Sequence, residues 1–113
     1  MTDAIQVITT TASKEEADKL ANALVTRRLA ACVQVSGPIT STYRWQGKIE
    51  TSQEWVCVAK SLESKYPALE AAICELHSYA VPEILATRVV AGHRSYLAWL
   101  AAELADGPER RVV

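Results

Sequence analysis

The candidate metal ligands of this sequence are Cys32, His77 and Glu83. A cysteine thiolate is a soft ligand that suits Cu(I), whereas an imidazole and a carboxylate together suit a divalent cation. His77 and Glu83 are six positions apart, around a turn expected at Tyr79 and Pro82, and this spacing matches no compact metal-binding signature. We therefore expect His77 and Glu83 to need a third ligand from a neighbouring chain.

Each of the three also has a structural interpretation. Cysteine is often buried simply as a small apolar residue, so Cys32 could serve packing between chains. His77 could cap the C-terminus of a helix, where an imidazole meets unsatisfied carbonyl groups. Glu83 could form an ion pair or accept a hydrogen bond from a loop amide. The residue types alone do not decide between the ligand and the structural roles.

Large aromatic side chains form the second group of functional candidates. Such residues are favoured in pockets and in interfaces, and interface packing is the expected role of most of them. The candidates for a cleft or interface between chains are Tyr43, Trp45, Trp55 and Trp99.

The remaining cysteines and the second histidine are expected to have no role in chemistry. Cys57 and Cys74 fall among the core residues of the hydrophobic pattern, and His93 follows Gly92 at the expected start of a helix and should be exposed. The sequence also contains no nucleophile elbow and no HExxH, Walker A or GxGxxG pattern. We therefore expect that the protein has no catalytic residues and is not an enzyme.

Length and composition predict one globular domain that covers residues 1–113. Half of the residues are hydrophobic and 22% are charged, and 12 basic against 13 acidic side chains leave a net charge of −1. This balance argues against nucleic acid as a partner and against a membrane surface. Three cysteines without a CxxC pair, and a first segment unlike a signal peptide, predict reduced thiols in the cytoplasm.

The hydrophobic pattern predicts an α+β fold. Strands are expected at 4–10, 30–35 continued by 39–45, 49–60 and 84–91, and helices at 13–28, 62–77 and 96–104. The order βαββαβ is that of a ferredoxin-like antiparallel sheet with two helices on one face, here with an extra C-terminal helix. The tail from 106 onwards is expected to be a loop, an edge strand or a frayed end.

Local signals support these elements. Ser13 and Glu16 form a capping box, in which each side chain would satisfy a free amide at a helix start. Pro38 predicts a bulge, because it cannot donate to a strand ladder, and Gln46-Gly47 predicts a hairpin turn. Pro67 lies early enough to occupy the first turn of the second helix.

Both faces of the expected sheet carry apolar residues, although two helices can cover only one face. In the strand at 49–60, Val56 and Val58 point to one face of the sheet and Trp55 and Cys57 to the other. In the strand at 4–10, Ile8 points to the face opposite to that of Val7. A solvated monomer would leave this second surface exposed, so we expect a homo-oligomer, whose symmetry the pattern does not define.

Four stretches of the chain closely resemble the CutA family of divalent-cation tolerance proteins. They are residues 28–33, 41–49, 77–84, and Gly92 followed by 96–100, and they occur in the family's order over nearly the whole chain. Where the family typically reads His-Pro-Tyr-Glu-Val-Pro-Glu, this chain has Ser78 and Ala80, so position 80 offers no carboxylate ligand.

The resemblance implies a homotrimer of ferredoxin-like subunits, similar in architecture to the PII signalling proteins, with a cytoplasmic role linked to divalent cations and above all to copper. The leading hypothesis is therefore a trimeric metal tolerance and copper-binding protein with Cys32, His77 and Glu83 as ligands. The alternative is a PII-like signalling module that binds a small molecule between subunits, although the four glycines form no phosphate-binding loop.

Overall fold

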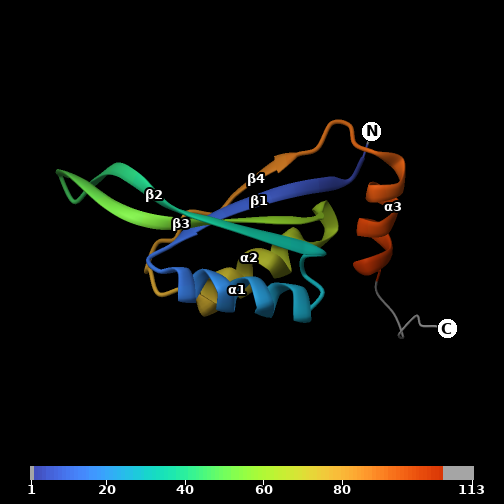
Figure 1. Ribbon diagram of the computed structural model, residues 1–113, viewed down its shortest axis with the longest axis horizontal. Coiled ribbons are helices and arrows are strands. Elements are labelled where there is room, and N and C mark those ends of the chain that lie inside the picture. The colour runs from blue at the N-terminus through green and yellow to red at the C-terminus, as the bar shows by residue number, and fades with distance from the viewer. Residues whose placement is uncertain (1, 106–113) are drawn as a thin grey trace.

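The computed structural model describes residues 2–105, so the predicted tail from 106 to 113 lies outside the described residues. The elements follow one another as β1 (Ala4–Thr11), α1 (Lys14–Thr26), β2 (Cys32–Trp45), β3 (Lys48–Leu62), η1 (Glu63–Lys65), α2 (Tyr66–Leu76), β4 (Leu85–Arg88) and α3 (Arg94–Glu103). The strands pair antiparallel in the order β2-β3-β1-β4. This order confirms the predicted ferredoxin-like α+β fold (Figure 1).

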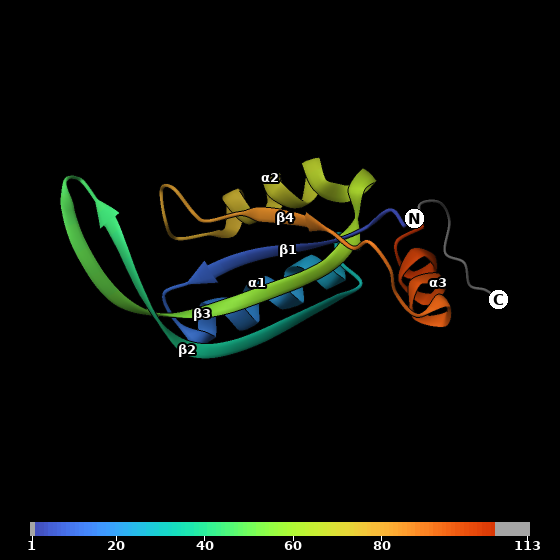
Figure 2. The ribbon, with the colours of Figure 1, turned by 90° about the horizontal axis from the view of Figure 1, so that it is seen from above.

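Helices α1 and α2 lie side by side on one face of the sheet, and α3 lies at the end of the sheet away from the β2–β3 turn (Figures 1 and 2). The core forms where the two helices meet the central strands, because apolar side chains alternate on that face. Its buried members come from β1, β3, α1 and α2, and include Ile5, Val7, Leu20, Leu24, Cys57, Ala59, Leu69 and Ile73.

Helix α1 begins where the sequence predicts, but the Glu16 carboxylate does not bind the amide that a capping box would give it. The Ser13 hydroxyl accepts a hydrogen bond from the Glu16 amide at 3.1 Å, which confirms the first half of the capping box. The Glu16 carboxylate reaches instead across to Ser78, 62 positions away in the sequence. A local pattern therefore predicted the helix start but not the long-range partner of its acid.

The C-terminus of α1 differs from the prediction. The helix ends at Thr26, and Arg28 takes the left-handed conformation with a φ of 59°. The Leu29 amide then bonds back to the Leu24 carbonyl at 2.9 Å, which is the Schellman arrangement for closing a helix. Arg27 lies just past the helix and pairs with Glu75 of α2 at 3.3 Å.

Helix α2 confirms the predicted end near His77, but it begins at Tyr66 rather than at 62, because Leu62 ends β3 and Glu63–Lys65 form the short helix η1. Leu69 and Ile73 are fully buried, and His77 is the C-terminal cap. Pro67 lies in the first turn. The prediction that Cys74 packs in the core is wrong, because the next position after Ile73 is rotated by about 100° around a helix and here faces solvent.

Strands β2 and β3 form a long hairpin that projects beyond the helices and β1 (Figures 1 and 2). The turn at Gln46 and Gly47 has φ values of 50° and 81°, as a type I′ hairpin turn requires. The register shifts between Ser36 and Ile39, which confirms the bulge predicted from Pro38. We call the part of the hairpin from Ile39 to Glu54 the arm.

Candidate functional site

The loop between α2 and β4, residues 77–84, meets the start of α1, the end of β1 and the base of the arm. The His77 side chain is fully buried at the entrance of this loop. Its Nε2 lies 2.7 Å from the Thr10 carbonyl oxygen, and its Nδ1 accepts a hydrogen bond from the Tyr79 amide at 3.0 Å. A carbonyl only accepts and an amide only donates, so the ring proton is on Nε2. Backbone groups of this chain therefore occupy both ring nitrogens.

Glu16 binds the next residue of the loop at two points. The Ser78 amide donates to Glu16 Oε2 at 2.9 Å, and the Ser78 hydroxyl donates to Oε1 at 3.1 Å. Partial burial raises the pKa of Glu16, but the hydrogen bonds from the Ser78 amide, the Ser78 hydroxyl and the Ala12 amide outweigh that effect and lower the pKa below 4.5. The ionised carboxylate thus fastens the loop to α1.

This pKa shift predicts how Glu16 affects stability at different pH values. A carboxyl whose pKa is lower in the folded than in the unfolded chain stabilises the fold above the unfolded value, and that stability is lost as pH falls through the folded value. Wild type should therefore be more stable than Glu16→Gln near neutral pH, and the difference should shrink as pH falls below 4.5. Urea unfolding from pH 7 to pH 3 measures the difference.

Ser78→Ala is the matched variant for that measurement. It removes the hydroxyl donor and keeps the amide donor, so it should show a smaller difference with the same pH dependence. A difference between wild type and Glu16→Gln that stays constant over the whole pH range would contradict the charged interaction.

Tyr79 joins the loop to the base of the arm. Its hydroxyl donates to Glu54 Oε2 at 2.9 Å, and Glu54 is only 7% exposed. Burial, followed by the hydrogen bond to the Glu54 carboxylate, raises the pKa of Tyr79 to about 12. The Tyr79 ring also contacts the ring of His77, with 4.8 Å between centroids. Tyr79 is therefore a hydrogen-bond donor at neutral pH and is poorly suited to act as a base.

Cys32 lies away from this network. It is the first residue of β2, half-buried, and pairs with Lys60 on the sheet face opposite to α1 and α2. Lys60 pairs in turn with Gln6, four positions along β1 from Thr10, where His77 is anchored. Four strand positions correspond to about 13 Å, so Cys32 and His77 do not meet within one chain.

Glu83 is exposed in the same loop as His77, ahead of β4. The structure therefore brings none of the three predicted ligands into one cluster within the chain. Within residues 2–105, no group of three or more His, Cys, Asp or Glu side chains is arranged to hold a metal ion.

The aromatic candidates separate into one packed and three exposed residues. Trp55 packs against the core, whereas Tyr43, Trp45 and Trp99 remain 41–45% exposed. Trp99 contacts the ring of Tyr96, with 5.5 Å between centroids. Three of the four predicted residues are thus available for contact with another molecule.

The sheet face without helices is also apolar, as the sequence predicts. Ile8, Val56 and Val58 share that face and are only partly buried, and Leu85 beside Ile8 is 59% exposed. No helix among residues 2–105 has the length and apolar character that a membrane span requires.

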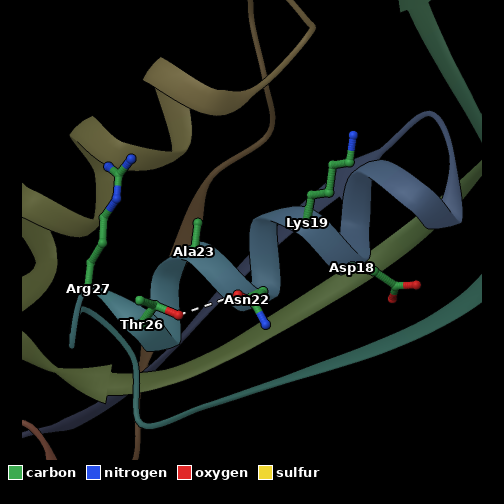
Figure 3. A pocket seen from close by; sticks show the side chains of 6 residues that line it. All are labelled: Asp18, Lys19, Asn22, Ala23, Thr26 and Arg27. Carbon is green, nitrogen blue, oxygen red and sulfur yellow. Dashed lines mark hydrogen bonds between the residues drawn. The ribbon is translucent and has the colours of Figure 1, made fainter.

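Two hollows lie on the surface of α1. The first, of about 340 Å³, lies next to the loop and is lined by Ser13, Glu15, Glu16, Lys19, Leu20, Leu76 and Ser78. The second, of about 510 Å³, lies along the outer side of the helix (Figure 3) and is lined by Asp18, Lys19, Asn22, Ala23, Thr26 and Arg27. Its charged ends are already paired, Asp18 with Lys14 at 2.8 Å and Arg27 with Glu75 at 3.3 Å.

Little in the residue pattern indicates that Glu16 and Glu54 belong to the network of hydrogen bonds around the loop 77–84. Glu16 follows Ser13 in a capping pattern, and the simplest interpretation of Glu54 from its residue type is surface solvation. The available signal for Glu54 was its position directly before Trp55 and the densest apolar section of the strand, where a solvated carboxylate is unexpected.

This chain is similar in sequence to a family of known proteins. Residues 5–103 match the family described as CutA1 divalent ion tolerance protein. The chain is similar to the divalent-cation tolerance protein CutA of Thermus thermophilus, with 44% identity over 83% of this chain and 91% of the relative. It is also 38% identical, over 85% of its length, to the chloroplastic protein CutA 1 of Oryza sativa, of which it spans only 54%.

The solved structures agree with the sequence match. The crystal structure of CutA from Xylella fastidiosa superposes with a TM-score of 0.90 at 38% identity, covering 92% of this chain and all of the other. Likeness in both sequence and fold extends from β1 to α3. The chain therefore belongs to the CutA1 divalent ion tolerance protein family.

Proposed function

We propose that this chain is a non-enzymatic divalent-cation tolerance protein that binds copper and works as a homotrimer in the cytoplasm. The observation that carries the proposal is the family match, which spans residues 5–103 and includes both the loop network and the arm. The free thiols of Cys32, Cys57 and Cys74 suit a reducing compartment.

The apolar surfaces support the homotrimer. The sheet face with Ile8, Val56 and Val58 has no helix over it, and the arm presents Tyr43 and Trp45 to solvent. Self-association buries such apolar surfaces, and each Å² removed from water stabilises the assembly by about 25 cal/mol. Light scattering should therefore give a mass of three times 12.3 kDa, and a monomer would contradict the proposal.

The donor chemistry supports Cys32 as the central copper ligand. Its thiol is half-buried on the sheet face that association between chains would cover. Cu(I) prefers thiolate ligands, and Glu83 supplies an exposed carboxylate. His77 joins the site only by giving up its hydrogen bond to Thr10 or to Tyr79. A single chain is not a complete site, so the proposed ligands come from more than one chain.

A copper titration with cysteine variants tests this proposal. Calorimetry with Cu²⁺, and with Cu⁺ under anaerobic conditions, should show saturable binding to wild type and a loss of at least about tenfold in affinity for Cys32→Ser. Cys74→Ser is the matched control, because Cys74 is exposed on α2 and should bind no copper at this site. Equal losses in the two variants, or no saturable binding to wild type, would contradict the proposed ligand.

A further inference from the structure

The arm leaves the body of the protein at a single position. The pairing of β1 with β3 ends at Thr11 and Trp55, so that β3 has only β2 beside it from Glu54 to the turn. The register shift between Ser36 and Ile39 lies directly opposite, and Pro38 within it donates no backbone hydrogen bond. A bulge bends a strand where it occurs, so this base is where the arm can change direction.

Trp55 fills one side of this base. A Cβ atom at Gly37 would lie 2.7 Å from Trp55 Cδ1 and 2.9 Å from Cγ, so the indole lies against the backbone of the bulge. This contact places the aromatic ring on the core side of the sheet, where Trp55 packs against buried residues.

Glu54 holds the opposite side. Adjacent residues in a strand point to opposite faces, so its carboxylate lies on the face away from the Trp55 indole. Glu54 is only 7% exposed, whereas all the remaining residues of the arm are partly or fully exposed. Its carboxylate accepts the Tyr79 hydroxyl at 2.9 Å.

Tyr79 is itself held firmly by the body of the protein. Its amide donates to His77, whose ring is anchored on the Thr10 carbonyl at 2.7 Å. Ser78 between them is bound to Glu16 of α1 through two hydrogen bonds. Contacts therefore run without interruption from α1 and β1, through the loop, to the base of the arm.

We propose that Tyr79 and Glu54 form a latch that fixes the direction in which the arm leaves the sheet, and so couples the loop that carries Glu83 to the arm. The latch is closed in this structure, because the Tyr79 hydroxyl donates to the Glu54 carboxylate at 2.9 Å. A change in the loop, such as the engagement of Glu83 by a cation, reaches Tyr43 and Trp45 through this contact.

Hydrogen exchange followed by mass spectrometry tests the latch. In Tyr79→Phe the ring remains but the donor is lost, and amides of residues 39–54 should exchange about tenfold faster, since a hydrogen bond to a charged acceptor is being removed. Amides of α1 and β1 should exchange at the wild-type rate. Glu54→Gln keeps an acceptor oxygen for the phenol and should show a smaller acceleration in the same segment.

Tyr66→Phe is the matched control, because Tyr66 also donates to a carboxylate, Glu70, at 3.0 Å but on the exposed surface of α2. It should leave the exchange of the arm unchanged. Unchanged exchange of the arm in Tyr79→Phe, or equal acceleration over the whole chain, would overturn the latch. Light scattering on the same samples shows whether the proteins share one assembly state, so the test is independent of the proposed homotrimer.

Discussion

Replacing Gly37 with alanine is expected to destabilise the protein by about 3 kcal/mol. The added Cβ would lie 2.7 Å from Trp55 Cδ1 and 3.1 Å from the Glu54 carbonyl oxygen, and the backbone φ of 153° is one that side chains other than glycine rarely adopt. The indole is packed against the core and the carbonyl is backbone, so neither can move away freely. Urea unfolding at a fixed protein concentration measures the loss.

Gly47→Ala separates the steric clash from the backbone effect. Gly47 also has a positive φ, of 81°, but no atom lies within 4 Å of the position of its added Cβ. This variant should lose only about 1 kcal/mol, from the conformation alone. Equal losses at the two glycines would show that the contact with Trp55 is not the cause.

Replacing His77 with alanine should cost a similar amount, about 3 kcal/mol. The change removes a fully buried ring, leaves the Thr10 carbonyl and the Tyr79 amide without their partner, and ends the ring contact between His77 and Tyr79. A buried polar group without a partner is costly, and the space left by the ring adds to that cost. The free energy of unfolding from urea titration is the measurement.

His93→Ala is the natural control, since the chain has only two histidines. His93 is exposed and caps α3 by accepting a hydrogen bond from the Tyr96 amide at 3.3 Å, so its replacement should cost about 1 kcal/mol or less. If His77→Ala were as mild as His93→Ala, the anchoring of the loop by its imidazole would be contradicted.

The order and type of the elements were predictable because each has a strong local signal. Ser13 marks the start of α1, Gln46-Gly47 marks the hairpin turn, and the stripe through Leu69 and Ile73 marks α2. The last strand was predicted to be longer than the observed Leu85–Arg88. Its pairing with β1 covers only Ile5–Ile8, and the length of a strand depends on its partner as well as on its own residues.

The loop network was harder to predict, because its contacts join positions far apart in the chain. Glu16 and Ser78 are 62 positions apart, and Glu54 and Tyr79 are 25 apart. The residue types of His77 and Glu83 indicated a ligand role, but residue type does not reveal that backbone groups occupy both nitrogens of an imidazole. Only the fold supplies those partners.

The three thiols lie in different environments, so their rates of alkylation can be used to follow the association of chains. Burial raises the pKa of Cys57 to about 11, so at neutral pH this thiol should react very slowly with an alkylating reagent. Cys74 is open to solvent on α2, and Cys32 lies half-buried on the sheet face opposite to α1 and α2, near Tyr96 of α3. The ratio of alkylation rates at Cys32 and Cys74, measured by peptide mass spectrometry, therefore reports whether that face is occupied, with no introduced cysteine and with Cys74 as the internal standard.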